Sequence, residues 1–269
     1  MPSFRLTVAY DGTDFVGWQR QAAGVSIQGL LEDALAPLED RRVAVTGAGR
    51  TDAGVHAEGQ VAAVSLERWI DPATLVRAVN ARLPPTVRVL DAIAVPENFH
   101  PRFDALAKTY RYRLFTGPVL SPFAVRYVWH APGPLDVEAM SAAASSLAGE
   151  HDFSAFRSAG TDVERAIRVV YQSIVAGGSQ SRIAPGLEPA IDAVGRGEYV
   201  TYTVRGSGFV RHMVRTVVGS LVEIGRGRRP PGWLVEVLES RDRAAAGPTA
   251  PPQGLALVRV DYPRLAAEP

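Results

Sequence analysis

The chain has 269 residues, of which 46% are hydrophobic and 21% are charged, and its formal net charge is +1. This is the composition of an ordinary globular protein, and it excludes a disordered or low-complexity chain. The absence of cysteine excludes disulfide bonds, thiol catalysis and cysteine-bound zinc. No apolar run approaches the roughly 20 residues that cross a bilayer, and the first residues lack a signal-peptide pattern. We therefore expect a cytoplasmic protein.

Arginine supplies nearly all of the positive charge. Of the 29 basic residues, Lys108 is the single lysine. Guanidinium groups bind phosphates through two parallel hydrogen bonds and stack on bases, so an arginine-rich surface suits nucleic acid. Alanine and proline are also abundant, which favours coding bias equally, and the composition leaves both interpretations open.

The first half of the chain alternates between strand and helix patterns. Four segments are predicted as strands: 4–10, 41–45, 60–66 and 86–95. Two helices are predicted, at 26–38 and at 71–83. Ser26 is the expected N-cap of the first, and Asp71 followed by Pro72 marks the start of the second. The order β-α-β-β-α-β is that of the split-βαβ, or ferredoxin-like, motif.

The second half of the chain shows the same kind of strand and helix pattern. Four further strands are predicted: 108–115, 166–176, 198–206 and 255–262. Three further helices are predicted: 136–149, 210–225 and 231–240. The segment 177–190 is predicted to be a long surface hairpin loop, because it is rich in glycine, serine and proline.

Taken together, the elements predict an α+β fold with two tandem split-βαβ units and mainly antiparallel sheets. The first domain is expected at 1–104 and the second at 105–264, with the junction near the segment 97–107. A duplicated topology leaves a cleft between its halves, and ligands often bind at domain junctions. We therefore expect the active site in that cleft.

Residues 45–64 read VTGAGRTDAGVHAEGQVAAV and place four glycines and several polar side chains between two apolar runs. A dinucleotide-binding loop is excluded, because Asp52 stands where the third glycine is required and no Walker lysine is present. A deaminase-type zinc site is excluded as well. His56 and Glu58 match half of its signature, but the cysteines of the other half are missing.

Two interpretations of this segment remain. Glycines and an aspartate between two strands are typical of a structural turn. Alternatively, Asp52 is a catalytic carboxylate that has a nearby arginine as its partner. Arg50 and Asp52 lie two residues apart and would face the same side of an extended chain. Such an aspartate can attack an electrophilic sugar carbon, as in glycosidases.

The segment 47–62, GAGRTDAGVHAEGQVA, closely resembles the signature of the TruA family of tRNA pseudouridine synthases. Further blocks resemble this family and occur in its order: YDGTDFVGWQRQ, FHPRFDALAKTYRYRL, GFVRHMVRTVVGSLVEIG and GLALVRVDYP. These blocks extend over essentially the whole chain, which makes the resemblance far more specific than one short motif. It implies the pseudouridine synthase fold.

The resemblance implies a reaction and a nucleophile. In the family the aspartate of the GRTD block is essential, and it corresponds to Asp52. The enzyme detaches uracil from the ribose of a tRNA uridine, turns the base and rejoins it through carbon 5. Nothing is oxidised, so no cofactor and no metal are implied. The aspartate could attack the sugar, attack the uracil ring or remove a sugar proton; we favour the sugar, and the sequence leaves the choice open.

The resemblance also identifies Tyr110 as the active-site tyrosine. On a strand, Tyr110 and Tyr112 share one face and Arg111 and Arg113 the other. A tyrosine ring can stack on an extruded base, and its hydroxyl can transfer protons. We expect Tyr112 to lie in the core and Tyr110 to lie outside it.

Arg215 resembles the family arginine that pairs with the catalytic aspartate. It flanks a stripe of apolar residues that we expect to be buried: Val210, Met213, Val214, Val217, Val218 and Leu221. By pattern alone Arg215 would be a solvated helix charge, and the resemblance reverses that interpretation. Arg50 is a second candidate, either as the partner of Asp52 or as a phosphate contact.

The resemblance further implies a homodimer that binds the anticodon stem-loop of tRNA and modifies uridines 38, 39 and 40. Flipping a stacked uridine costs a few kcal/mol, and basic side chains should hold the phosphates. The candidates are Arg20, Arg50, Arg102, Lys108, Arg111, Arg113, Arg226, Arg228 and Arg229.

Two other functions are alternatives to this interpretation. A binding module without catalysis is suggested by the segment 205–212, RGSGFVRH, which partly matches the signature of an RNA-recognition motif. That signature belongs on a central strand, whereas this segment runs into a strongly helical pattern. A glycoside hydrolase would require a second carboxylate as general acid. Glu58 is close in sequence, but nothing in the pattern gives it that role.

Overall fold

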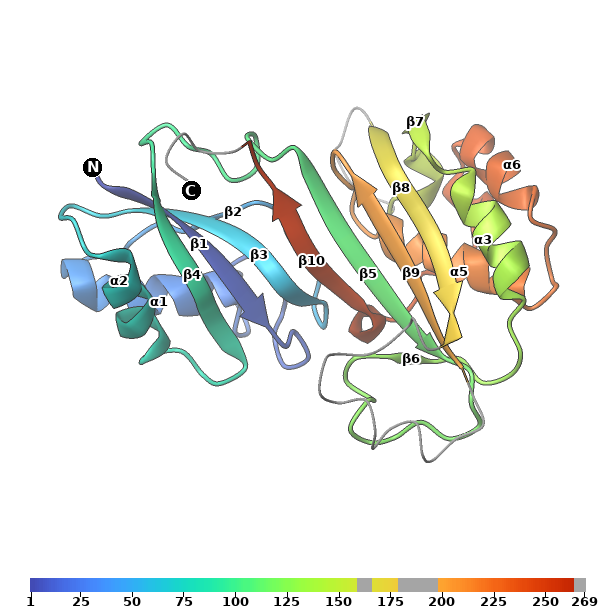
Figure 1. Ribbon diagram of the computed structural model, residues 1–269, viewed down its shortest axis with the longest axis horizontal. Coiled ribbons are helices and arrows are strands. Elements are labelled where there is room, and N and C mark those ends of the chain that lie inside the picture. Colours follow the sequence, from blue (N-terminus) through green and yellow to red (C-terminus); the bar gives the residue numbers. More distant parts are fainter. Residues whose placement is uncertain (159–165, 179–197, 264–269) are drawn as a thin grey trace. The chain divides into compact units, whose positions relative to one another are not determined.

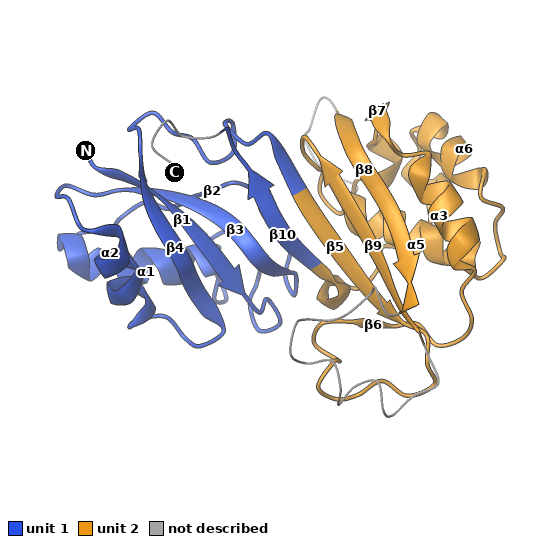
Figure 2. Cartoon of the chain, viewed as in Figure 1, with its two compact units in different colours: residues 1–108, 256–269 blue, residues 109–255 orange. Residues whose placement is uncertain are grey.

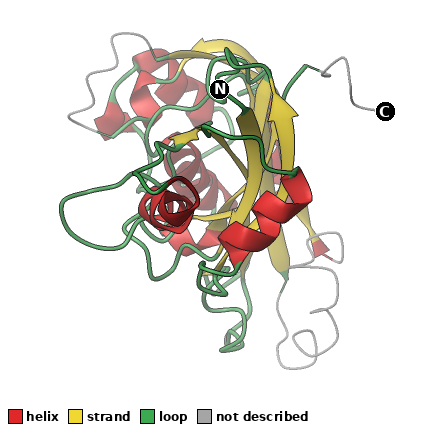
Figure 3. Ribbon diagram, turned by 90° about the vertical axis from the view of Figure 1, so that its left-hand side faces the viewer, coloured by secondary structure: helices red, strands yellow, loops and turns green. Residues whose placement is uncertain are grey.

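The computed structural model describes residues 1–158, 166–178 and 198–263, and their helices, strands and loops can be followed in Figures 1 and 3. From residue 179 on, the predicted hairpin loop 177–190 lies outside the described residues. The chain divides into two compact units (Figure 2). Unit 1 comprises Met1–Lys108 and Ala256–Pro269, and unit 2 comprises Thr109–Leu255. Each unit combines strands with helices, so the fold belongs to the predicted α+β class.

Unit 1 is built on a mainly antiparallel sheet. Its strands are β1 (Ser3–Tyr10), β2 (Thr46–Gly47), β3 (His56–Ser65), β4 (Val87–Val95) and β10 (Leu255–Asp261), whose first residue lies in unit 2. Strand β1 pairs antiparallel with both β3 and β4, and the two-residue β2 pairs antiparallel with β3. The helices are α1 (Ile27–Glu39) and α2 (Pro72–Asn80).

Local sequence signals explain most of these elements. The predicted face of β1 is buried, because Phe4, Leu6 and Val8 are inaccessible to solvent. Helix α1 begins behind Ser26, whose hydroxyl accepts a hydrogen bond from the Gly29 amide. Helix α2 begins behind Asp71 in the same way and packs against β4.

The predicted strand at 41–45 is wrong. Only Thr46 and Gly47 pair with β3 in this region. Val43 and Val45 are buried while their neighbours are exposed, so the segment imitates the alternation of a strand. The end of this segment is held by a side chain and not by strand pairing, because the Gln28 side-chain amide donates to the Val45 carbonyl (3.0 Å).

The last strand also differs from expectation. The sequence placed it in a second domain at 105–264, but Ala256–Asp261 belongs to unit 1. It runs parallel to β3, with Ala256 opposite His56 and Leu257 opposite Ala57. The local pattern predicts a strand but contains no information about a pairing partner about 200 residues away.

Unit 2 also combines strands with helices. Its strands are β5 (Ala107–Phe115), whose first two residues lie in unit 1, β6 (Trp129–His130), β7 (Gly149–Asp152), β8 (Ile167–Gly177) and β9 (Tyr199–Gly206). They follow the order β5-β9-β8-β7, with β8 antiparallel to β7 and β9 and with β6 beside β5. The helices are α3 (Val137–Ser145), α5 (Met213–Gly225) and α6 (Trp233–Ser240), and α3 packs on β8 and α5.

The predicted helices of unit 2 are present but shorter. Helix α3 ends at Ser145, and the predicted end at 149 falls on β7, which the sequence analysis missed together with β6. Helix α5 begins at Met213 because His212 takes a left-handed conformation (φ 65°). The predicted stripe of α5 is buried as expected. No helix within the described ranges is long and apolar enough to span a membrane.

Candidate active-site loop

The glycine-rich segment forms a loop, residues 48–55, that joins β2 to β3. Its exposure alternates, since Arg50 is exposed, Thr51 is buried and Asp52 is half-buried. The Val55 amide donates to the Asp52 carbonyl (3.1 Å), which closes the turn. The side chain of Thr51 is thus held inside the unit, while its two charged neighbours are accessible to solvent.

A buried chain of hydrogen bonds holds this loop from below. The Gln60 side-chain amide donates to the Gly49 carbonyl (2.9 Å) and to the Tyr10 hydroxyl oxygen (3.4 Å). The Tyr10 and Thr51 hydroxyls lie 2.8 Å apart. Because the Tyr10 oxygen accepts from Gln60, its one proton is available for Thr51. Burial raises the pKa of Tyr10 to about 12, so its hydroxyl remains neutral at physiological pH.

The segment 11–18 packs directly against the same loop. The Trp18 amide donates to the Thr51 carbonyl (3.1 Å). Gly17 has a positive φ of 104°, and a Cβ on it would lie 2.6 Å from the Thr51 carbonyl oxygen. A Cβ on Gly12 would lie 2.0 Å from the carbonyl oxygen of Val55. The YDG and GW positions of the first sequence block are therefore explained by close contact with the Asp52 loop.

Two further side chains contact the loop and its neighbours. The Lys108 ammonium donates to the Ala48 carbonyl (2.6 Å), so the single lysine fixes the beginning of the loop. The His56 imidazole accepts a hydrogen bond at Nδ1 from the Gly12 amide (3.0 Å) and lies 3.2 Å from the Asp11 carboxylate. His56 thus has a structural role where the loop enters β3. Glu58, which together with His56 matches one half of the excluded zinc signature, is exposed.

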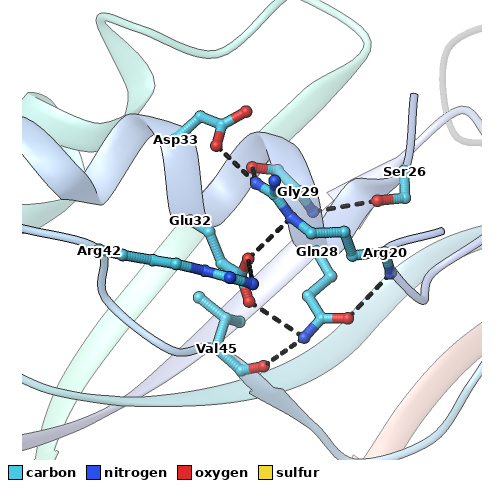
Figure 4. A network of polar contacts seen from close by, with 8 residues as sticks. All are labelled: Arg20, Ser26, Gln28, Gly29, Glu32, Asp33, Arg42 and Val45. Atoms are coloured by element: carbon cyan, nitrogen blue, oxygen red, sulfur yellow. Dashed lines mark hydrogen bonds and ion pairs between the residues drawn. The ribbon is translucent and has the colours of Figure 1, made fainter. Parts of the chain in front are cut away.

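A polar network around helix α1 ties down the segments that lead to the loop (Figure 4). Glu32 is only 2% exposed, and its carboxylate contacts Arg20 Nε (2.9 Å), Arg42 Nη2 (3.1 Å) and Gln28 Nε2 (3.1 Å). Arg20 also pairs with Asp33, and this hydrogen bond raises the pKa of the Arg20 guanidinium. Arg20, predicted to contact tRNA, is therefore engaged with two carboxylates of α1.

In unit 2, Tyr110 lies on β5. It is 7% exposed, and its ring meets the Phe209 ring edge-on at 5.0 Å between centroids. The expectation that Tyr110 lies outside the core is wrong for this structure, because Phe209 covers it. Tyr112 is fully buried, as predicted, and its hydroxyl donates to the Pro251 carbonyl (2.8 Å). Arg113 is buried and Arg111 is half-buried.

Arg215 lies half-buried on α5. Its Nε donates to the Ala250 carbonyl (2.7 Å), and the Ala250 amide donates back to the Arg215 carbonyl (3.0 Å). The extended segment around residue 250 therefore fixes the direction of the guanidinium. Among the other arginines of this unit, Arg228 pairs with Glu223 (2.9 Å), and Arg229 lies over the Trp233 ring.

Comparison with known proteins identifies the family. The sequence profile of a family described as tRNA pseudouridine synthase matches residues 6–104 and 143–263. The chain is 46% identical over 262 residues to tRNA pseudouridine synthase A of Myxococcus xanthus, which covers 97% of this chain and 92% of the relative. It is 45% identical to the protein of the same name from Ralstonia nicotianae, over 100% of this chain and 94% of the relative. A third, from Syntrophotalea carbinolica, is 42% identical over 97% of both chains.

The chain belongs to the TruA family of tRNA pseudouridine synthases. Enzymes of this family are isomerases that act on uridines in tRNA. This membership sets aside the two other functions that were weighed. The structure agrees with it at the segment 205–212, which runs from the end of β9 into the turn before α5 and forms no central strand.

Within this TruA family member, the predicted site residues fall into two groups. Asp52, Arg50, Arg20 and Lys108 lie in unit 1, whereas Tyr110, Arg111 and Arg215 lie in unit 2. In unit 1, Lys108 and Asp52 belong to the same local assembly through the loop. The described residues contain no cluster of three or more histidine and carboxylate side chains that could hold a metal ion.

Three residues that support the Asp52 loop were not predicted from the sequence: Tyr10, Thr51 and Gln60. One signal was available. Gln60 is the polar residue that begins the apolar run QVAAV, and it is fully buried in β3. Since a buried amide requires hydrogen-bond partners, its position indicated a polar contact beneath the strand, although not which loop would supply it.

Proposed function

We propose that this chain converts uridine to pseudouridine at positions 38, 39 and 40 in the anticodon stem-loop of tRNA. Membership in the TruA family supports the reaction, and the resemblance of the sequence blocks supports the target positions. The proposal includes a homodimer in the cytoplasm, as in the family that the blocks resemble.

The proposed reaction is an isomerisation in which every atom is conserved. The bond between uracil N1 and ribose C1′ breaks, the base turns, and a bond forms between C5 and C1′. The proton on C5 leaves to solvent, and N1 gains one. No electrons are transferred to or from an external acceptor, so the proposal requires no cofactor.

In this proposal Asp52 is the nucleophile. The observation that carries it is the construction of its loop. Buried Gln60 and Tyr10 hold Gly49 and the Thr51 side chain before Asp52, and the Val55 amide binds the Asp52 carbonyl after it. Asp52 is half-buried, and the nearby residues Arg50 and Ala53 are exposed, so a flipped nucleotide can approach the loop from solvent. Because the nucleophile is already held in place, less conformational entropy is lost on the way to the transition state. We favour attack at the sugar; attack on the ring and removal of a sugar proton are the alternatives.

Tyr110 and Arg215 complete the proposed site. Tyr110 would stack on the flipped uracil after the Phe209 ring that covers it moves aside, and its hydroxyl would take part in proton transfer. Arg215 would pair with Asp52. Its fixed side chain supports this role, because the Nε contact to Ala250 leaves the guanidinium oriented. Arg50, two residues from Asp52, is the alternative partner.

Basic side chains are proposed to hold the tRNA phosphates. Arg50 is exposed beside Asp52, and Lys108 and Arg111 are half-exposed. Arg20 belongs to the same proposal, although its carboxylate partners reduce the contribution that we expect from it. Each such contact releases counterions, so binding of tRNA should weaken steeply with added salt.

The nucleophile is tested with unmodified tRNA that carries tritium at uracil C5. Formation of pseudouridine must expel this label into water, whereas a protein that only binds tRNA leaves it in place. Asp52→Asn keeps the size of the side chain and should reduce release by at least about 10³-fold, with tRNA binding retained. Asp91→Asn changes an exposed carboxylate on β4 and serves as the matched control.

Chemical mapping of pseudouridine in the product tRNA tests the target positions. Modification at 38, 39 and 40 is expected, and modification elsewhere in the molecule would contradict the proposed site. If Asp52→Asn releases tritium at the rate of the Asp91→Asn control, the assignment of the nucleophile is wrong.

A further inference from the structure

The segment 96–106 of unit 1 presents an aromatic side chain to solvent. Phe103 is 75% exposed, although burial of a phenylalanine is strongly favourable. Its ring lies 4.2 Å from the His100 ring, and the Arg102 guanidinium carbon lies 5.8 Å from its centroid. One exposed aromatic residue is common on protein surfaces. An exposed ring with a cation and an imidazole beside it is more specific.

This segment is held in place by hydrogen bonds of its own. His100 Nδ1 accepts from the Arg102 amide (3.1 Å) and the Phe103 amide (3.3 Å). The Asp104 carboxylate accepts from the His100 amide (2.8 Å), and the Asp104 amide donates to the His100 carbonyl (3.0 Å). The turn around Phe103 is therefore closed on both sides, which opposes its collapse onto the protein.

The segment is also attached to the sheet of unit 1. The Tyr262 hydroxyl donates to the Pro101 carbonyl (2.6 Å), and the Tyr262 ring packs against Phe99 at 5.3 Å. The Leu106 amide donates to the Asp261 carbonyl beyond the turn (2.8 Å). The base of the segment is thus anchored to β10, and its tip is the part that carries Arg102 and Phe103.

We propose that Phe103, with Arg102 and His100, is a stacking platform for an unpaired nucleobase of the tRNA substrate. Aromatic rings are the usual partners of unstacked bases in RNA recognition, and an adjacent arginine adds stacking and phosphate contact. A preformed platform retains more of the stacking energy, because little side-chain and loop entropy is lost on binding. The inference rests on the proposed function, since it takes tRNA as the ligand.

The test compares two phenylalanines of nearly equal exposure. Phe123 is 77% exposed, and its ring has no aromatic or cationic neighbour among the described residues, so Phe123→Ala is the matched control. Phe103→Ala should raise the Kd for unmodified tRNA about 10-fold. Phe103→Tyr keeps an aromatic ring, so its Kd should stay within about twofold of the wild-type value. Phe123→Ala should leave it within about twofold. Because Phe103 makes no phosphate contact, the salt dependence of binding should not change in Phe103→Ala.

A continuous RNA duplex of similar length supplies the second comparison, because it has no unpaired base to stack. Phe103→Ala should bind this duplex as the wild type does. Equal losses on duplex and tRNA would overturn the proposal, as would equal effects of Phe103→Ala and Phe123→Ala. A lower molecular mass of Phe103→Ala in analytical ultracentrifugation would show instead that the residue forms a contact between copies of the chain. That result would also overturn the proposal.

Activity separates this inference from the function on which it rests. At saturating tRNA, Phe103→Ala should release tritium at the wild-type rate, with KM raised in proportion to Kd. Wild-type release with an unchanged Kd in Phe103→Ala overturns the platform alone. Failure of the wild-type protein to bind tRNA or release tritium would overturn the proposed function and the platform with it.

Discussion

Asp52 and Arg215 are held by opposite means. Around Asp52 the protein fixes the backbone, through Thr51 and Gly49, and leaves the short side chain half-exposed. Around Arg215 the helix already fixes the backbone, and the long side chain is anchored through Nε to the Ala250 carbonyl. Aspartate has few rotamers, so a rigid backbone suffices to position it. Arginine has about 2 kcal/mol of rotamer entropy, so it needs a contact of its own.

The largest effect within this comparison is expected from Arg215→Met. It removes the charge that we propose to pair with Asp52 and should lower tritium release about 10²- to 10³-fold. The free energy of unfolding should fall by only about 1 kcal/mol, for the lost bond to Ala250. Kinetics and denaturant unfolding on the same preparation check this.

Arg215→Lys sharpens the result. Lysine keeps the charge but lacks the Nε donor, so it should recover only a part of the lost rate. Complete recovery would show that the anchor to Ala250 is dispensable. A loss of stability that accounts for the whole rate defect of Arg215→Met would leave Arg215 a purely structural residue.

Tyr10→Phe is expected to have the next largest effect. It removes the hydroxyl between Gln60 and Thr51, loosens the backbone beside Asp52 and should lower kcat about 10-fold, since small displacements of reacting groups are costly. Tyr202→Phe is the matched control. Tyr202 is equally buried, and its hydroxyl lies 3.0 Å from that of Ser173 in unit 2.

Both tyrosine variants should lose about 1 kcal/mol of stability, because each removes one buried hydroxyl. Only Tyr10→Phe should lose turnover beyond what the loss of folded protein explains. Equal turnover in the two variants would mean that the bond between Tyr10 and Thr51 does not position Asp52.

The pH dependence of stability tests the same hydroxyl. Burial raises the pKa of Tyr10 to about 12 from its ordinary value of 10.0. The folded state therefore binds this proton more tightly, and the resulting stability is complete below pH 10 and lost as pH rises towards 12. At pH 11 the loss from Tyr10 should be about 1.4 kcal/mol.

Denaturant unfolding at pH 8 and pH 11 measures this loss, and Tyr10→Phe should show a correspondingly smaller difference between the two pH values. Burial raises the pKa of Tyr112 and of Tyr202 in the same direction, so the wild-type chain should lose more stability than Tyr10 alone explains. An unchanged pH difference in Tyr10→Phe would contradict the burial of its hydroxyl.

The smallest effect is expected from Arg20→Gln. Arg20 lies far along the chain from Asp52 in the α1 network, and its side chain is 38% exposed. Ion pairs of such exposure contribute well under about 1 kcal/mol, and Arg42 and Gln28 still contact Glu32. Turnover and tRNA binding should stay within about twofold. A larger loss of tRNA binding would mean that Arg20 leaves its carboxylates to bind tRNA.

The elements that could be predicted are those whose signals are local. The caps at Ser26 and Asp71 and the buried stripe of α5 depend on residues a few positions apart, and the structure confirms them. Segment 41–45 shows the limit, since it has the alternation of a strand but no partner strand. The enclosure of Tyr110 depends on Phe209, about 100 residues later, and could not be derived from the strand pattern.

The sequence by itself determined the family and the residues proposed for the chemistry, because the matching blocks extend over nearly the whole chain. Only the tertiary structure decided how Asp52 is supported, which strand completes unit 1, and which arginines already have carboxylate partners. The physical reason is the range of the interactions. Motifs record which side chains are required, whereas a hydrogen bond between Tyr10 and Thr51 or a strand pair between β3 and β10 forms only when distant segments fold together.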